Sequence, residues 1–137
     1  MKRILFSDRK YAMDWAILIM RLTVAIMIIT HGWTKIVNFS EKLNNFPDPV
    51  GLGPASSMQL AIFAEFFCGI LLALGFMTRW ALIPLIITMA ILVLIEHRGD
   101  PFSQMELSLL YLVSFLFLFL SGPGKYSMDH QILKRNR

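Results

Sequence analysis

The sequence is short of charged residues and of cysteine. Asp, Glu, Lys and Arg make up 16% of its 137 residues, whereas a soluble domain typically carries about 25%. The single cysteine, Cys68, excludes an internal disulfide and a C-x-x-C pair for dithiol or zinc chemistry. Glycine and proline are modest, at 8 and 6 residues, which excludes a collagen-like chain. Because 56% of the residues are hydrophobic, a disordered chain and an ordinary water-soluble domain are excluded as well.

Four apolar blocks dominate the chain, and each is long enough to cross the roughly 30 Å hydrocarbon core of a bilayer as a helix. A soluble four-helix bundle would need a polar face on every helix, but the block 80–95 offers Thr88 as its clear polar residue. The sequence therefore predicts one domain, an all-α integral membrane four-helix bundle over residues 1–137. The predicted helices span residues 12–37, 57–77, 79–96 and 106–121.

The basic residues are distributed unevenly between the two sides of such a bundle. With four spans, both termini and the tight turn between the second and third helices lie on one side. The positive-inside rule predicts that this side is cytoplasmic, so the loops 38–56 and 97–105 face outward. The net charge of +4 then indicates a membrane surface, not nucleic acid, as the partner. Nine of the 13 Lys and Arg residues lie on the cytoplasmic side, namely Lys2, Arg3, Arg9, Lys10, Arg79, Lys125, Lys134, Arg135 and Arg137.

The outer loop 38–56 is the longest connection in the predicted fold. Phe39, Leu43 and Phe46 have helix-like spacing, which predicts a short interfacial helix over residues 39–45. The following stretch, 46–54, holds three prolines and two glycines and is predicted to form turns.

Arg21 and Glu65 are predicted to lie deep inside the first and second spans. A charge at mid-bilayer costs about 2.5–3.5 kcal/mol and usually faces the protein interior with a partner. At 1.5 Å per residue, their Cα atoms differ in depth by about 8 Å, which an Arg side chain can bridge. Small residues recur beside both, which favours close packing of the two helices. We therefore predict that the Glu65 carboxylate contacts Arg21 on one side and His31 on the other.

This group has more than one interpretation. A buried carboxylate near an imidazole can hold or move a proton, or bind a polar head such as a quinone carbonyl. The alternatives are an ion pair that only fixes helix register, or charges that extend to the membrane surface. Lys35 and Glu106, near the outer ends of the first and fourth helices, complete the candidate ligand-binding or proton-relay group of Arg21, His31, Lys35, Glu65 and Glu106.

His97 and Arg98, which follow the third helix, are weaker candidates for the same pocket. His31 and His97 have no fixed local spacing, so they are weak evidence for a bis-His haem, and no metal site is predicted.

Several motifs, in this order, resemble the DoxX family of small bacterial four-helix membrane proteins. They are Arg21, His31-Gly-Trp-Thr-Lys35, Phe46-Pro-Asp-Pro-Val-Gly-Leu-Gly53, Phe63-Ala-Glu65, Leu74-Gly-Phe-Met-Thr-Arg79, Glu106 and Gly122-Pro-Gly-Lys-Tyr-Ser-Met-Asp129. The resemblance covers residues 21–129 and implies a multi-pass protein of the bacterial cytoplasmic (inner) membrane. The family takes its name from a subunit of a thiosulfate:quinone oxidoreductase, and other members are linked to a membrane oxidoreductase complex. The resemblance therefore implies an association with redox chemistry and quinone.

Three functions follow as hypotheses. The first is a redox-associated membrane protein whose buried group binds a quinone head or relays protons, with electrons supplied by a bound cofactor or a redox partner protein. The second is a non-catalytic membrane subunit or assembly factor. The third is a small transporter, which is disfavoured because four short helices leave little room for alternating access unless the protein forms a homo-oligomer. Whether the protein is an enzyme stays open at this stage.

Overall fold

A computed structural model describes residues 10–136, and this part of the chain is helical with no strand. Four of its helical spans are long and apolar enough to cross a membrane. The predicted all-α bundle of four membrane helices is therefore confirmed. Lys2, Arg3, Arg9 and Arg137, which entered the orientation argument, lie outside the described residues. In chain order the elements are α2 (Lys10–Val37), α3 (Phe39–Leu43), α4 (Pro54–Ile62), η1 (Phe63–Cys68), α5 (Gly69–Leu74), α6 (Thr78–Ile91), η2 (Leu92–Glu96), α7 (Phe102–Ser121) and α8 (Met128–Arg135).

The second and third spans each contain a π-helical segment. The second span runs from Pro54 to Leu74 through η1, and the third runs from Thr78 to Glu96 and ends in η2. The second and fourth spans begin three and four residues before their predicted starts, at Pro54 and Phe102. Pro54 occupies the first turn of α4, where a missing backbone N–H is tolerated, and Pro101 is the N-cap of α7. Proline therefore stands at the start of both helices, where a turn and a loop were predicted.

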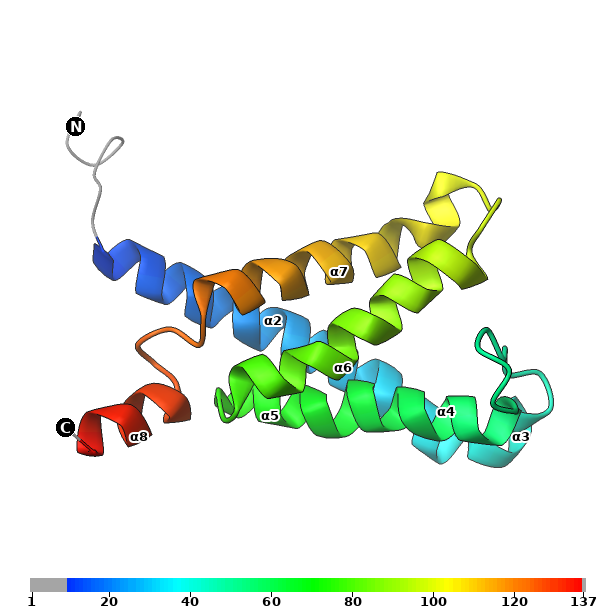
Figure 1. The fold of residues 1–137 in the computed structure, drawn as a ribbon, viewed down its shortest axis with the longest axis horizontal. Helices are drawn as coiled ribbons and strands as arrows, with labels where there is room; N and C mark the ends of the chain where they lie inside the picture. The colour runs from blue at the N-terminus through cyan, green and yellow to red at the C-terminus, as the bar shows by residue number, and fades with distance from the viewer. Residues whose placement is uncertain (1–9, 137) are drawn as a thin grey trace.

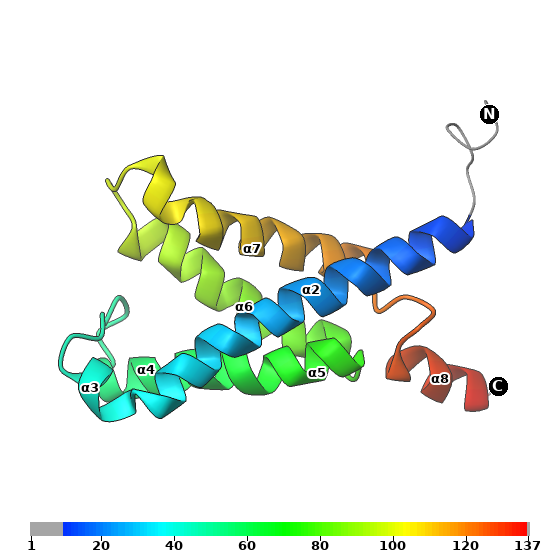
Figure 2. The same ribbon diagram turned by 180° about the vertical axis from the view of Figure 1, so that it is seen from behind.

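The four spans pack side by side, with α6 between α7 and the second span, while α2 crosses behind α6 (Figure 1). The view from the opposite side shows α2 in front, lying against α5 and η1 (Figure 2). The most buried side chains include Leu72, Leu85 and Phe115, where the spans meet. By contrast, Trp80 is 71% exposed and Leu120 is 79% exposed, as expected for residues that face lipid tails.

The predicted packing of the first helix on the second is confirmed. α2 contacts η1 and α5 directly. At Gly32, an added Cβ would lie 2.7 Å from the backbone nitrogen of Phe66. Only glycine allows the two backbones to come this close.

The bundle has two distinct ends, which we call the loop end and the tail end (Figure 1). The loop end carries residues 38–53, including α3, and the η2–α7 turn. The short helix predicted there over residues 39–45 is confirmed as α3. The tail end carries the start of α2, the α5–α6 turn and the segment 122–136 with α8, a helix that was not predicted.

Candidate functional site

The structure pairs Glu65 with Lys35, not with Arg21. The Lys35 ammonium donates a hydrogen bond to the Glu65 carboxylate and forms an ion pair with it. Glu65 is buried within η1, whereas the Lys35 side chain, two residues before the end of α2, is 19% exposed. π-Helical segments of this kind are frequent at functional sites. The pair therefore places two buried or half-buried charges, of opposite sign, in the loop-end half of the bundle.

The predicted contact between Arg21 and Glu65 is wrong, and the direction of helical side chains explains why. Side chains lean toward the N-terminus of their helix. Arg21 on α2 therefore leans toward the tail end. Glu65 lies on the antiparallel second span and leans toward the loop end, away from Arg21. Lys35 leans back from the loop end toward the bilayer interior and so meets Glu65.

A cavity of about 90 Å³ lies beside the Lys35–Glu65 pair. It lies between α2, η1, the third span and α7, and both polar and apolar side chains line it. We call it the polar cavity. Its lining residues are Ile28, His31, Lys35, Glu65, Met89, Leu92, Leu107, Ser108 and Tyr111.

Tyr111 is the residue of this cavity that sequence reasoning missed. It is only 5% exposed, and its hydroxyl has no hydrogen-bond partner among residues 10–136. His31 packs edge-to-face against its ring, with the ring centroids 6.0 Å apart. A buried hydroxyl left without a partner costs about 1–3 kcal/mol. The Tyr111 hydroxyl is therefore a donor available to a molecule that enters the polar cavity.

Arg21 has a different set of partners, at the tail end. Its guanidinium donates hydrogen bonds to the backbone carbonyls of Pro123 and Tyr126, the second over 2.8 Å. The Asp129 carboxylate accepts from the backbone N–H groups of Met77 and Thr78, over 2.8 and 2.9 Å. These contacts tie the segment after α7 to α2 and to the α5–α6 turn. We call this set of interactions the tail clamp.

The α5–α6 turn and α8 are shaped for the tail clamp. Gly75 adopts φ +66°, and a Cβ there would lie 2.6 Å from the Cβ of Ser127. Ser127 caps α8 by accepting a hydrogen bond from the backbone N–H of His130. Gly75 and Ser127 therefore allow the tail to pack against the α5–α6 turn. Arg21 is part of the same tail clamp.

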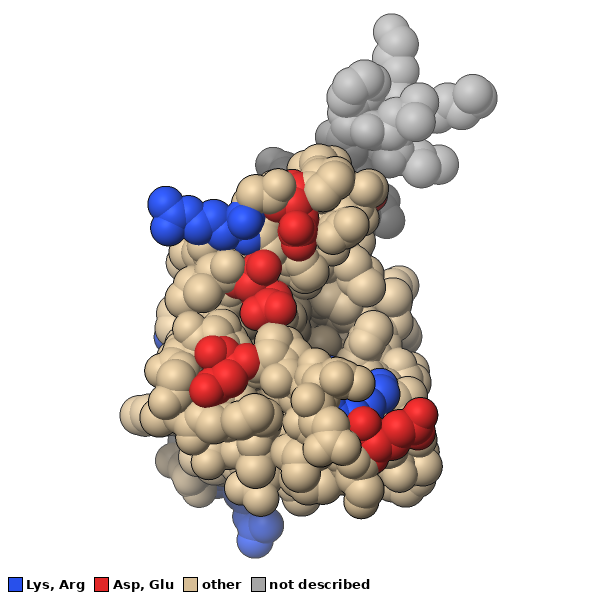
Figure 3. All heavy atoms as spheres, turned by 90° about the vertical axis from the view of Figure 1, so that its right-hand side faces the viewer, with Lys and Arg blue, Asp and Glu red and all other residues tan. Residues whose placement is uncertain are grey.

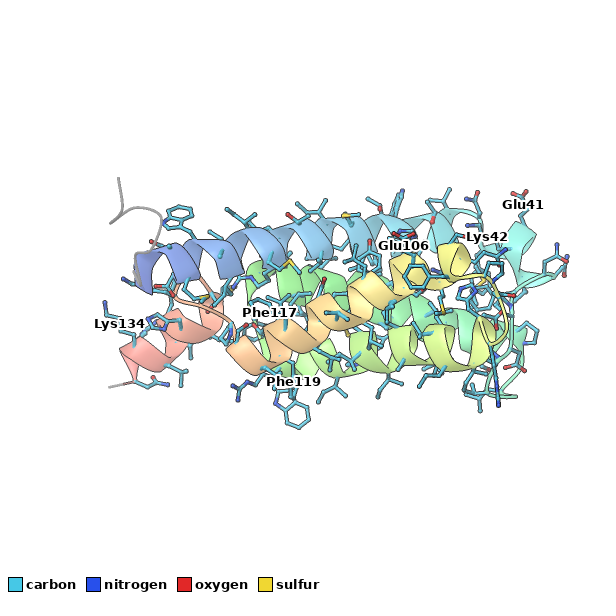
Figure 4. All side chains as sticks on the ribbon, turned by 90° about the horizontal axis from the view of Figure 1, so that it is seen from above. Glu41, Lys42, Glu106, Phe117, Phe119 and Lys134 are labelled. Atoms are coloured by element: carbon cyan, nitrogen blue, oxygen red, sulfur yellow. The ribbon has the colours of Figure 1, made fainter. Side chains whose placement is uncertain are left out.

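Glu106, His97 and Arg98 do not line the polar cavity. Glu106 is exposed on α7 at the loop end, far from Lys134 at the other end of the molecule (Figure 4). His97 contacts Asp100 over 3.1 Å, and Arg98 is exposed. Within the described part of the chain, no group of three or more His, Cys, Asp or Glu side chains could hold a metal ion.

Asp48 organises the loop that precedes α4. Its carboxylate accepts hydrogen bonds from the Ser57 hydroxyl and from the backbone N–H groups of Leu52 and Gly53, over 2.7 to 3.0 Å. The bond from Ser57, followed by the backbone bonds, lowers the pKa of Asp48 below its usual value. The loop is therefore held by an ionised carboxylate close to the start of the second span.

Acidic side chains are spread over the loop end, which is hollowed near its centre (Figure 3). This end also carries the basic residues Lys42 and Arg98. The acidic residues of its loops and helix ends are Glu41, Asp48, Glu96, Asp100 and Glu106.

Comparison with known proteins gives one consistent result. The family profile of DoxX matches residues 16–98. An uncharacterised protein of Haemophilus influenzae is 32% identical over 123 residues, covering 85% of this chain and 90% of that protein. The inner membrane protein YqjF of Escherichia coli is 30% identical over 128 residues, covering 89% and 95%. An uncharacterised membrane protein of Mycobacterium tuberculosis is 29% identical over 143 residues, covering 88% and 83%. No solved structure matches the chain.

Proposed function

The chain belongs to the DoxX family, and we propose that this multi-pass protein of the bacterial inner membrane binds the head of a lipid-soluble, quinone-like molecule in its polar cavity. The observation that carries the proposal is the buried Tyr111 hydroxyl, which lines the cavity and has no partner among the described residues. A carbonyl or hydroxyl oxygen of such a head would accept this hydrogen bond. The chain acts here as one DoxX-like membrane domain.

The residues of the polar cavity suit a neutral head that carries oxygen. Tyr111 donates a hydrogen bond, and the Lys35 ammonium is a second donor within the same cavity. The Glu65 carboxylate accepts a hydrogen bond from a head that bears a hydroxyl, or holds a proton released by it. His31 is an additional side chain of the cavity that can donate or accept a hydrogen bond. Four side chains of the polar cavity therefore offer hydrogen-bond donors and acceptors to the head.

The charge distribution supports an orientation with both termini in the cytoplasm. The described basic residues of the tail end include Arg79, Lys125, Lys134 and Arg135, whereas those of the loop end are Lys35, Lys42 and Arg98. By the positive-inside rule, this asymmetry supports a tail end in the cytoplasm and a polar cavity toward the outer leaflet. A redox role would also require an electron carrier. That the protein associates with a redox partner protein, or with further copies of itself, stays a prediction.

The Lys35–Glu65 pair also supports a second function, that of a non-catalytic membrane subunit or assembly factor. The pair joins α2 to η1, and the tail clamp joins α2 to the segment after α7. Charges with a purely structural role would affect stability and leave ligand binding unchanged. The two proposals therefore differ in what a loss of the Tyr111 hydroxyl does.

Equilibrium titration of the purified protein with a soluble benzoquinone analogue tests the proposal. The wild type should bind saturably, and Tyr111→Phe should weaken binding by about 2- to 12-fold, the equivalent of one hydrogen bond. Tyr126→Phe is the matched control, because Tyr126 lies at the tail end, and it should bind as the wild type does. Absence of saturable binding by the wild type, or equal affinity of Tyr111→Phe, would refute the proposal and favour the structural role.

A further inference from the structure

An apolar groove between α2 and α7 adjoins the polar cavity. Its volume is about 180 Å³. Met20, Val24 and Met27 form its α2 wall, and Leu107, Leu110 and Tyr111 belong to its α7 wall. Met27 and Leu110 are 44% and 61% exposed, so the groove faces the surrounding lipid. Methionine side chains adapt to irregular apolar shapes, which suits a groove that admits flexible chains.

The groove and the polar cavity are adjacent. Leu107 and Tyr111 line both of them. Along α2, the cavity residues lie between Ile28 and Lys35, and the groove residues lie between Met20 and Met27. The combined site therefore follows α2 for about 22 Å at 1.5 Å per residue, from the loop end toward the middle of the span.

The volumes of the polar cavity and of the groove indicate which part of the ligand each can hold. A cavity of about 150 Å³ is known to accommodate benzene. The polar cavity, at about 90 Å³, is smaller than this, whereas the groove, at about 180 Å³, is larger. A ring that places an oxygen beside Tyr111 and Lys35 therefore exceeds the polar cavity. The adjacent groove offers space for the rest of the ring and for any chain attached to it.

The charges of the polar cavity select among amphiphiles. Lys35 and Glu65 are both present there and paired, so their formal charges cancel. An anionic phosphate head would lie beside the Glu65 carboxylate and gain little from a lysine that is already paired. A neutral head with carbonyl or hydroxyl oxygens meets no such repulsion and satisfies Tyr111. This argues against a bilayer phospholipid as the occupant.

We propose that the ligand is a neutral amphiphile with an apolar chain, which enters sideways from the bilayer between α2 and α7 and leaves its chain in the groove. This inference rests on the proposed function, because the head of the ligand occupies the polar cavity. It adds the position of the ligand's apolar chain and the route of the ligand, which does not pass through water.

Photocrosslinking in lipid nanodiscs tests this inference. The probe is a benzoquinone whose alkyl chain carries a diazirine, and mass spectrometry maps the labelled residues. Labelling should concentrate on residues 20–27 and 107–114 and disappear with an excess of the unlabelled long-chain quinone. Val24→Phe, which fills the groove, should abolish this labelling. Ile26→Phe is the control, because Ile26 is 59% exposed and lies outside the groove.

A second variant and a second probe make the test decisive. Val24 is 7% exposed, and a larger side chain there could prevent folding, so Leu110→Trp fills the groove from an exposed position on α7. Labelling that stays unchanged in both variants, or that spreads over lipid-facing residues such as Leu120, would overturn the inference. A phospholipid with a diazirine in its acyl chain that labels the groove and is not displaced by quinone would also overturn it. Normal titration of the soluble analogue in either case would leave the proposed function standing.

Discussion

Replacing Arg21 with methionine should release the tail and leave ligand binding intact. Arg21 is 2% exposed and donates hydrogen bonds to the carbonyls of Pro123 and Tyr126. Hydrogen bonds from a charged donor contribute about 1.5–3 kcal/mol each. Because removal of a buried charge also relieves its desolvation cost, the expected net loss of clamp stability is about 2–4 kcal/mol.

Amide hydrogen exchange measures this loss residue by residue. The backbone N–H groups of Met77, Thr78 and His130 are bonded within the tail clamp and α8, so they report its opening. A loss of 2–4 kcal/mol corresponds to exchange that is roughly 30- to 900-fold faster. The control is Arg79→Met, which removes an exposed arginine at the same end and should leave exchange unchanged.

The two possible roles of Arg21 give opposite results in this experiment. If Arg21 belongs to the tail clamp, Arg21→Met accelerates exchange at the tail end and binds the quinone analogue as the wild type does. If Arg21→Met instead weakens ligand binding while the three amides stay protected, Arg21 belongs to the ligand site, and its role in the tail clamp is refuted.

Three further outcomes are expected. Gly32→Ala should lower the free energy of unfolding by about 1–3 kcal/mol, more than Gly69→Ala does. A Cβ added at Gly32 would meet the η1 backbone, whereas a Cβ added at Gly69 would meet a flexible side chain. Equal thermal unfolding of the two variants would contradict this packing. Lys35→Met should lower the free energy of unfolding by about 3–5 kcal/mol, and adding Glu65→Gln should restore part of that free energy. Additive losses in a double-mutant cycle would argue against a coupled pair. Because hydrogen bonds lower the pKa of Asp48, protease resistance of the loop 44–53 should persist at neutral pH and be lost as the pH falls through that lowered pKa. Asp48→Asn should remove this pH dependence, and pH-independent cleavage of the wild type would contradict it.

The membrane fold could be predicted because length and hydropathy determine it. Four apolar blocks cannot be buried in 137 residues of soluble protein, so their number was clear from composition and spacing. The first residues of the second and fourth spans were harder to predict. Proline is typical of turns but is also favoured at the start of a helix, and Pro54 and Pro101 stand there. The helix α8 was missed because it is short, follows two glycines and a proline, and depends on the tail clamp.

The candidate site was only partly accessible from sequence. Glu65, Lys35 and His31 were identified because ionisable residues are rare in membrane spans. The predicted partner of Glu65 was wrong because the prediction used only the depth of each residue in the bilayer. It left out the direction in which each side chain leans along its helix. Tyr111 carries no motif and no charge. Its importance depends on burial and on a hydroxyl that finds no partner in the described part of the chain, which tertiary packing alone reveals.

Infrared difference spectroscopy with a quinone whose carbonyl carbons are isotope-labelled tests the central claim most directly. In the wild type, a hydrogen bond from the Tyr111 hydroxyl should shift one labelled carbonyl stretch to lower frequency than in an apolar solvent. The shift should vanish in Tyr111→Phe and persist in Tyr126→Phe. A carbonyl spectrum that is the same in the wild type and in Tyr111→Phe would contradict the assignment of the polar cavity as the site of the head.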